Sequence, residues 1–204
     1  MSDSSKMKIL HVGRLSYEKN VDVLIFSIKK IIKQYPNIVF DIIGEGPAED
    51  YLKKIAKKLK LQNNINFLGY IPRENLPRIY NSHDIFITAS TMETQGLVIL
   101  EAMASGLPIV AVNKYAIPNL VHHNENGFLA KPGDSNEISK FVIQLIKNKK
   151  LRKEFGKNSF ELSKKHDLVE VVKKMEEIYK KAIVKNSFIQ SLKSSSCSQL
   201  QPQF

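Results

Sequence analysis

Two glutamates, Glu93 and Glu101, are separated by seven residues in a segment that also contains Gly96 and Leu97. The spacing predicts that Glu93 lies in a loop and that Glu101 lies about one turn inside the helix that follows. Carboxylates accept hydrogen bonds from vicinal hydroxyls, and the amides at a helix start bind phosphate. We therefore expect one motif to hold the sugar, ribose and phosphate groups of a single ligand. The alternative, a surface helix with two incidental acids, is disfavoured by the glycines around it.

Two cations follow the first expected strand, in the segment Gly13-Arg14-Leu15-Ser16-Tyr17-Glu18-Lys19. Gly13 permits a tight turn, Arg14 supplies a planar fork of donors and Lys19 a point charge. Together they are suited to a diphosphate near a helix N-terminus. A solvated loop with two ordinary charges remains the alternative, because charges in loops are common.

A second glycine-containing turn, Gly44-Glu45-Gly46-Pro47, superficially resembles a dinucleotide fingerprint. The third glycine of that fingerprint is replaced by Glu49, and Pro47 interrupts it. The pattern therefore disfavours a redox enzyme. Gly44 and Gly46 either form a simple turn or let backbone amides approach a ligand closely.

The hydrophobic pattern of the sequence predicts the strands and helices that position these residues. Apolar, β-branched runs alternate with segments of helical period, which is typical of a parallel sheet with helices on both faces. The expected strands are 9–12, 38–43, 65–68, 85–88, 109–112 and 127–130. The expected helices are 20–34, 49–61, 74–80, 97–104, 138–147, 151–163 and 168–185. The predicted fold is α/β, a Rossmann-like doubly wound parallel sheet with C-terminal helices, and ligands bind such sheets at the carboxyl ends of the strands.

The same pattern predicts the domain organisation. Residues 1–7 form an N-terminal leader, residues 8–185 one domain, and the Ser- and Gln-rich residues 186–204 a disordered tail. Asp134 and Glu137 have the spacing of a capping box before the helix at 138–147. We see no internal repeat.

Composition narrows the function classes. Lys and Arg total 31 against 20 Asp and Glu, a formal charge of +11 that attracts anions. Basic-aromatic repeats and zinc-ligand spacings are missing from the sequence, so we expect no nucleic-acid partner. The single cysteine, Cys197, cannot form an internal disulfide, and no apolar run approaches the roughly 20 residues of a membrane span. A cytoplasmic protein is the expectation.

One basic segment has a second interpretation. Five lysines alternate with apolar residues between Leu52 and Lys60, which is typical of an amphipathic surface helix. The lysines are Lys53, Lys54, Lys57, Lys58 and Lys60. Their simple interpretation is a solvated face; the functional one is peripheral contact with the anionic cytoplasmic face of a membrane.

With these motifs in order, the sequence resembles the C-terminal, donor-binding domain of the family-four "group 1" retaining glycosyltransferases, which have a GT-B fold and an E-x7-E motif. The resemblance spans roughly residues 8–185. It is carried by the segments at 13–19 and 44–47, Phe67-Leu68-Gly69-Tyr70-Ile71-Pro72, the Glu93/Glu101 pair, and Asn126-Gly127-Phe128-Leu129 with Pro132-Gly133-Asp134. Asn20 stands where many relatives carry glycine, and Asn119 where many carry an acid. The segment Glu93-Thr94-Gln95-Gly96 is similar to that of glycolipid glucosyltransferases.

The resemblance implies a nucleotide-sugar donor, UDP-linked by preference and GDP-linked as the second choice, with no cofactor and no metal. It assigns Arg14 and Lys19 to the diphosphate, Glu93 to the hydroxyls of the transferred sugar and Glu101 to the ribose. Gly96 and Leu97 would approach sugar and phosphate through their backbones. Tyr70 and Ile71 would flank the base, and Gly13, Gly44 and Gly46 would line the cleft. The catalytic group would be Glu93, Arg14 and Lys19, the two cations stabilising the leaving diphosphate.

A complete GT-B enzyme has a second, N-terminal Rossmann-like domain that holds the acceptor, so the resemblance implies such a partner, as a separate chain or as a part missing from this one. The histidines could be proposed as substitutes for a catalytic residue, but isolated histidines are more often structural. They are His11, His83, His122, His123 and His166. A different class of function also stays open, a non-catalytic scaffold or regulatory module that keeps the glycosyltransferase fold.

Overall fold

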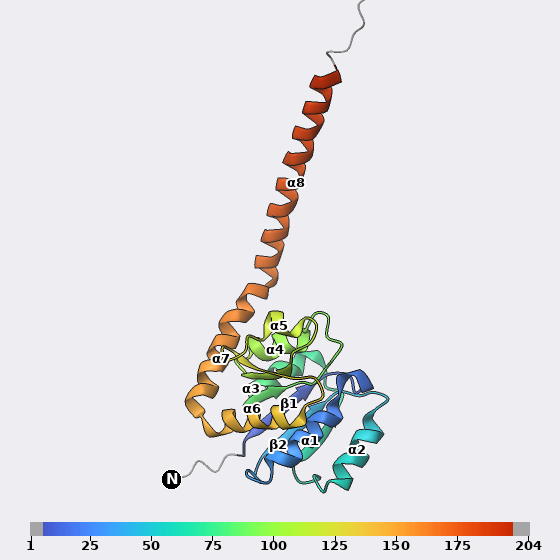
Figure 1. Cartoon of the computed structure of the whole chain (residues 1–204), viewed down its shortest axis with the longest axis vertical. Coiled ribbons are helices and arrows are strands. Elements are labelled where there is room, and N and C mark those ends of the chain that lie inside the picture. Colours follow the sequence, from blue (N-terminus) through green and yellow to red (C-terminus); the bar gives the residue numbers. More distant parts are fainter. Residues whose placement is uncertain (1–5, 198–204) are drawn as a thin grey trace, which may run out of the picture. The chain divides into compact units, whose positions relative to one another are not determined.

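Six parallel strands form one sheet in the order β3-β2-β1-β4-β5-β6 (Figure 1). The computed structural model describes residues 6–197. The strands are β1 Lys8–Val12, β2 Val39–Ile43, β3 Ile65–Gly69, β4 Ile85–Ile87, β5 Ile109–Val112 and β6 Gly127–Ala130. All six match the predicted strands to within one residue at each end. The predicted α/β doubly wound sheet is therefore confirmed.

The order of the strands reverses at β1. The chain runs outward from β1 through β2 to β3, and then returns to place β4 on the other side of β1. In an open parallel sheet this reversal separates the loops after the two central strands and creates a crevice at their carboxyl ends. The crevice is therefore expected between the loops that follow β1 and β4.

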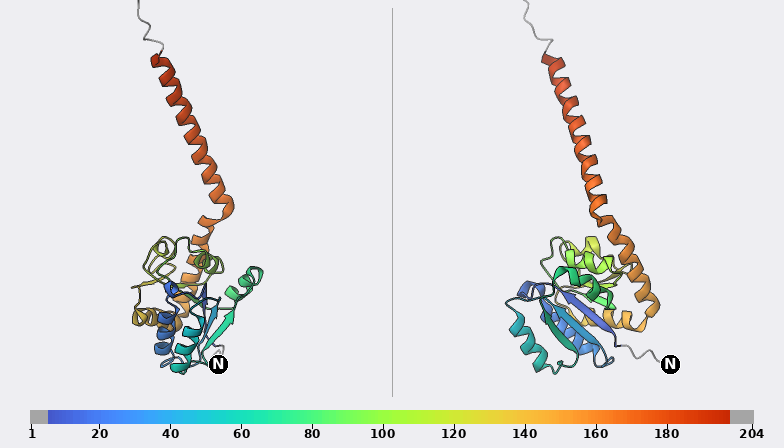
Figure 2. Two further views of the ribbon diagram at one scale, coloured as in Figure 1. Left: turned by 90° about the vertical axis from the view of Figure 1, so that its right-hand side faces the viewer. Right: turned by 180° about the vertical axis from the view of Figure 1, so that it is seen from behind.

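Helices lie against the sheet as the apolar periodicity predicts. The first unit contains α1 Val21–Ile31, α2 Glu49–Lys58, α3 Leu76–Asn81, α4 Leu97–Ala104, α5 Ile117–Leu120, α6 Ser135–Lys147 and α7 Lys149–Ser163. Helix α1 packs against α6 and α2, and α4 packs against α7 and α3. Figures 1 and 2 show α6 alongside α1. The side chains of Val21, Leu24, Ile28 and Ile31 of α1 are fully buried, as expected for one apolar face.

The core is buried on both faces of the sheet. Every residue of β5, from Ile109 to Val112, has no exposed surface. This explains why the strands read as continuous apolar runs rather than alternating ones.

Some elements differ from the prediction. Helix α5 was not expected, because four residues with Pro118 at the second position carry no helical period. Asp134 does cap α6, accepting hydrogen bonds from the amides of Asn136 and Glu137 at 2.9 and 3.0 Å. The expected reciprocal bond is wrong: the Glu137 carboxylate accepts from the amide of Lys131 at 2.6 Å instead.

The chain divides into two compact units between Lys164 and Lys165. The second unit contains α8, Leu168–Cys197. This helix continues past the predicted end at Lys185, because no glycine or proline interrupts it. Residues 198–204 of the predicted tail, and residues 1–5 of the predicted leader, lie outside the described residues. None of the helices in the described part of the chain is long and apolar enough to cross a membrane.

Candidate donor site

A pocket of about 250 Å³ opens at the carboxyl ends of β1 and β4, where the strand order reverses. Its lining comes from the end of β1 and the loop after it, from Thr88 after β4, and from the loop and first turn of α4. The lining residues are His11, Val12, Gly13, Arg14, Lys19, Thr88, Glu93, Thr94, Gln95, Leu97 and Val98. The sheet topology thus brings the two predicted cations and Glu93 into one place. We call this pocket the switch-point pocket.

The centre of the switch-point pocket is an ion pair between Lys19 and Glu93. Lys19 Nζ lies 3.0 Å from Glu93 Oε2, and both side chains are largely shielded from solvent, 20% and 16% exposed. The other carboxylate oxygen of Glu93 accepts a hydrogen bond from the amide of Gly96 at 3.0 Å. The Gly96 amide, predicted to approach a ligand, is therefore engaged by Glu93 in this structure. Arg14 is exposed at the rim.

Asn20 ties the two loops of the switch-point pocket together. Its backbone is left-handed, with φ of 49°, a conformation that asparagine adopts more readily than most residues. Its side-chain amide donates to Thr91 Oγ1 at 3.0 Å and to the Ala89 carbonyl at 3.3 Å. Asparagine can thus replace the glycine common at this position and add hydrogen bonds that glycine lacks.

Gly44 and Gly46 support the loop that carries Arg14. A Cβ on Gly44 would lie 2.0 Å from the Gly13 carbonyl oxygen, and one on Gly46 would lie 2.4 Å from that of Leu15. The Leu15 amide donates to the Glu45 carbonyl at 2.9 Å, which locks the two loops together. Within the described chain these glycines line neither the switch-point pocket nor the pocket around Glu101. The observed reason for glycine here is close backbone packing.

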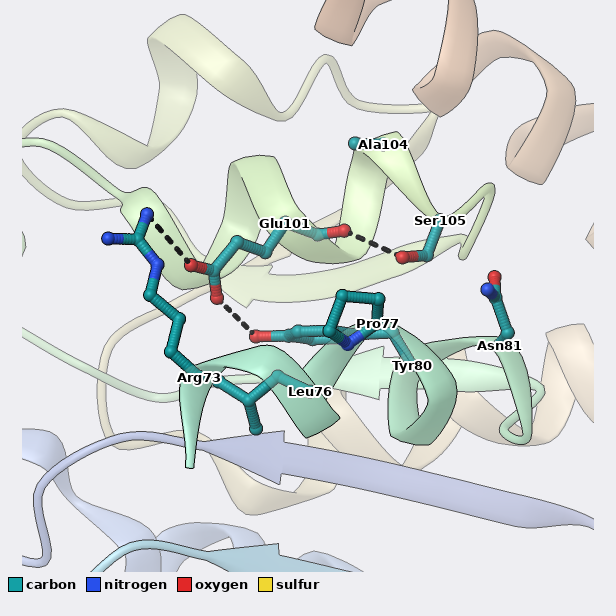
Figure 3. Close-up of a pocket in the computed structure, with 8 residues that line it drawn as sticks. All are labelled: Arg73, Leu76, Pro77, Tyr80, Asn81, Glu101, Ala104 and Ser105. Carbon is teal, nitrogen blue, oxygen red and sulfur yellow. Dashed lines mark hydrogen bonds and ion pairs between the residues drawn. The ribbon is translucent and has the colours of Figure 1, made fainter. Parts of the chain in front are cut away.

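Glu101 lies in a second pocket of about 420 Å³ between α3 and α4 (Figure 3). The hydroxyl of Tyr80 donates to Glu101 Oε2 at 2.9 Å, and the Arg73 guanidinium approaches Glu101 Oε1 at 4.0 Å. Figure 3 shows these three side chains converging at one end of the pocket. We call this pocket the Glu101 pocket. The two glutamates of the motif therefore line separate pockets, joined by the first turn of α4.

The Tyr80 phenol is a permanent donor to Glu101. Burial, together with the negative charge of Glu101 and the hydrogen bond to it, raises the pKa of Tyr80 far above its ordinary value. The hydroxyl therefore stays protonated and fixes one carboxylate oxygen. The second oxygen faces Arg73 and remains able to accept from a ligand.

Tyr70 and Ile71 follow β3. The Tyr70 side chain is 69% exposed, and its amide donates to Glu45 Oε1 at 3.3 Å. Ile71 packs partly against the core. Neither residue lines the switch-point pocket or the Glu101 pocket, which are both formed by other described residues.

The first unit contains four histidines, which differ in their hydrogen-bond and packing partners. His83 contacts Asp41 Oδ2 at 3.0 Å through Nε2 and the Ile79 carbonyl at 2.7 Å through Nδ1. His122 pairs with Glu125, and His123 packs edge-on against Phe128. His11 lies in the switch-point pocket and is the exception, because its buried Nε2 has no hydrogen-bond partner among the described residues.

Several residues of the two pockets were not predicted from sequence. Tyr80 and Arg73 stand in segments whose pattern shows only a helix and a loop, and His11 was named only among the histidines that were disfavoured as catalytic substitutes. Their positions depend on which elements pack together, and that information is absent from local spacing. No three His, Cys, Asp or Glu side chains gather as metal ligands anywhere in the described part of the chain.

Several known proteins are similar to this chain in sequence and in fold. The family described as "Glycosyl transferases group 1" matches residues 2–162. The alpha-monoglucosyldiacylglycerol synthase of Acholeplasma laidlawii is 33% identical over 177 residues, which are 86% of this chain and 44% of that protein.

Two crystal structures are also similar. The Anabaena protein HepE in complex with UDP and glucose has a TM-score of 0.78 and 27% identity, covering 86% of this chain and 48% of HepE. The C-terminal domain of the group 1 glycosyl transferase LpcC from Francisella tularensis has a TM-score of 0.72 and 29% identity, covering 80% of this chain and 87% of that domain.

The chain spans less than half of the length of the curated relatives most similar to it, between 28% and 47%. The match to the family nevertheless covers most of the chain, and it includes both pockets. This chain belongs to the group 1 glycosyl transferase family.

Proposed function

We propose that this chain is the donor-binding half of a retaining glycosyltransferase and that it binds a nucleotide-diphosphate sugar. The observation that carries the proposal is the switch-point pocket, where Arg14, Lys19 and Glu93 come together at the carboxyl ends of β1 and β4. Cations suit a diphosphate and a carboxylate suits hydroxyl groups, so the pocket matches the reacting end of such a donor.

The roles follow the two pockets. Arg14 and Lys19 hold the diphosphate and stabilise the negative charge that develops on it as the glycosidic bond breaks. Glu93 accepts hydrogen bonds from the transferred sugar, and the Leu97 amide faces the phosphate at the start of α4. Glu101, one turn farther along α4, accepts from the ribose hydroxyls. Tyr70 and Ile71 lie beside the base in this proposal.

Three further features belong to the proposal. The two cations take the place of a metal ion at the leaving group, so binding does not require one. UDP is the favoured nucleotide, with GDP as the second choice, since HepE is similar in fold and was crystallised with UDP. The similarity to a glucosyldiacylglycerol synthase supports a glycolipid acceptor. The cytoplasmic face of a membrane is the place of action that we propose for such an acceptor.

The acceptor would be held by a second, N-terminal domain. The chain covers less than half of several relatives, and this supports a partner domain of comparable size. That domain is encoded either in the same longer protein or separately.

Calorimetric titration with UDP, GDP and ADP in the presence of EDTA tests the proposal. We expect UDP to bind, and Arg14→Ala and Glu101→Ala each to weaken it by roughly 1 to 3 kcal/mol, the value of a charged hydrogen bond. Arg78→Ala is the matched control, because Arg78 is exposed and lines neither pocket. Failure to bind any nucleoside diphosphate would sink the assignment.

A further inference from the structure

His11 is a buried histidine with one engaged and one free ring nitrogen. Its side chain is 1% exposed, and Nδ1 lies 3.1 Å from the Ile87 carbonyl oxygen. A carbonyl oxygen only accepts hydrogen bonds, so Nδ1 must carry the proton. In the neutral ring Nε2 then has a lone pair and no proton. This nitrogen is buried and finds no partner in the part of the chain that the structure describes.

The imidazole that carries this nitrogen lies at the switch-point pocket. His11 lines that pocket together with Lys19 and Glu93. A Cβ on Gly13 would lie 3.6 Å from His11 Nε2, so a side chain at position 13 would contact the imidazole, whereas glycine places none there. A buried acceptor without a donor is costly, and such atoms are rare in folded proteins unless a ligand or water completes them.

The charge state of His11 limits what it can bind. Burial is the main cause that lowers the pKa of His11 to about 4; the hydrogen bond to Ile87 opposes this lowering, and the nearby charge of Lys19 adds to it. The ring is therefore neutral near pH 7, and Nε2 can only accept. The oxygens of a diphosphate are also acceptors at this pH, so they do not match Nε2. A hydroxyl group does.

We propose that His11 is a sugar-binding residue, whose Nε2 accepts a hydrogen bond from a hydroxyl of the transferred sugar beside Glu93. This inference rests on the proposed function. It adds a second hydrogen-bond acceptor to the sugar site. This acceptor lies on β1, far from Glu93 in the sequence. The two acceptors would engage the sugar from two different elements, which favours one orientation of the ring.

The test compares UDP with UDP-glucose, UDP-galactose and UDP-N-acetylglucosamine by calorimetry. In the wild-type chain we expect at least one of these sugars to improve affinity over UDP alone. His11→Phe keeps a ring of similar size and removes the acceptor. It should reduce that improvement roughly three- to tenfold, the value of one hydrogen bond, and leave the affinity for UDP unchanged.

His83→Phe is the matched control, because both nitrogens of His83 have partners and it lies outside the switch-point pocket. It should not change the ratio of affinities. Thermal unfolding of both variants identifies a loss of folding. If His11→Phe is too unstable to titrate, His11→Gln, which retains a polar acceptor, should preserve most of the preference for the sugar over UDP.

Several results would overturn the inference. An equal loss of affinity for UDP and for the UDP-sugar would mean that His11 acts at the diphosphate or stabilises the fold. An unchanged ratio of the affinities for UDP-sugar and UDP in His11→Phe would mean that Nε2 binds a water molecule and not the sugar. Proton uptake on UDP binding that disappears in His11→Phe, measured in buffers of different ionisation enthalpy, would show a charged ring. Wild-type chain that binds UDP but no sugar would also end this inference while the donor-domain proposal stands; no binding of UDP would end both.

Discussion

At the scale of single residues, the sequence predicted the chemical groups of the site better than their partners. Arg14, Lys19 and Glu93 were predicted from type and position, and the structure brings them into one pocket. The pairing of Glu101 with Tyr80 was not predictable, because it depends on how α3 packs against α4. Side-chain chemistry is readable locally, whereas the contact between two helices is set by the whole core.

Tyr80→Phe tests the role of the Tyr80–Glu101 hydrogen bond. The change removes the donor to Glu101 Oε2 and keeps the buried ring, so the carboxylate loses its fixed orientation. We expect UDP to bind about fivefold more weakly, as for the loss of one hydrogen bond. 2′,3′-Dideoxy-UDP, which lacks the ribose hydroxyls, should bind wild type and variant alike. Tyr35→Phe, in a side chain that lines neither pocket, is the control.

His11 also predicts a pH dependence of stability. Its folded pKa of about 4 lies below the ordinary value of 6.5, so the unfolded chain binds a proton over a range where the folded chain does not. The contribution of neutral His11 to the free energy of unfolding is fully present above about pH 6.5. It is lost as pH falls toward 4, and for a shift of this size the loss is roughly 3 kcal/mol. Urea unfolding across this range should show a shallower decline in His11→Phe. Parallel curves for the two proteins would contradict this.

At the scale of elements, the strands were predictable as continuous apolar runs, and most helices were predictable because each repeats one period over several residues. The four residues of α5 were too few for this. The loop at 44–47 was predicted as a simple turn or as a ligand-binding turn, whereas Gly44 and Gly46 lie where the backbones of two loops nearly touch. Close backbone approach leaves no trace in the sequence beyond the glycine itself.

Gly46→Ala should disturb the loop that carries Arg14. The new Cβ would lie 2.4 Å from the Leu15 carbonyl oxygen, so one of the two loops must move. We expect a loss of stability of about 2 kcal/mol or more, with weaker binding of UDP. Gly133→Ala is the comparison: its Cβ meets no atom within 4 Å, but φ is +79°. It should cost about 1 kcal/mol from the left-handed backbone alone and leave UDP binding unchanged. Equal effects on UDP affinity would refute the argument from packing.

At the scale of the whole molecule, the formal charge of +11 was evident from composition. Which of the charged side chains are exposed to a partner depends on the fold. Helix α2 buries Leu52 and Ala56 and exposes Lys53, Lys54, Lys57 and Lys58. Its apolar face is thus used by the core. Contact of α2 with a membrane would be electrostatic and would not involve insertion.

Co-sedimentation with vesicles of anionic and of neutral lipid tests this contact. We expect binding to anionic vesicles only, decreasing steeply as salt is raised above about 0.1 M, where charges are screened beyond about 10 Å. The double variant Lys54→Glu/Lys58→Glu should bind much less. Lys147→Glu/Lys150→Glu has the same net charge, and its exposed lysines lie outside α2. An equal loss in both would assign the attraction to total charge instead of to α2.

The ion pair between Lys19 and Glu93 has a consequence for how fragments of a donor are recognised. In the chain without ligand, each charged group neutralises the other across 3.0 Å. UDP alone would draw Lys19 away and leave the carboxylate with fewer partners, and free sugar alone would do the reverse. Each fragment should therefore prepare the site for the other, and by thermodynamic reciprocity UDP and glucose should raise each other's affinity by the same factor. Such positive cooperativity would show that the ion pair couples the diphosphate part of the site to the sugar part.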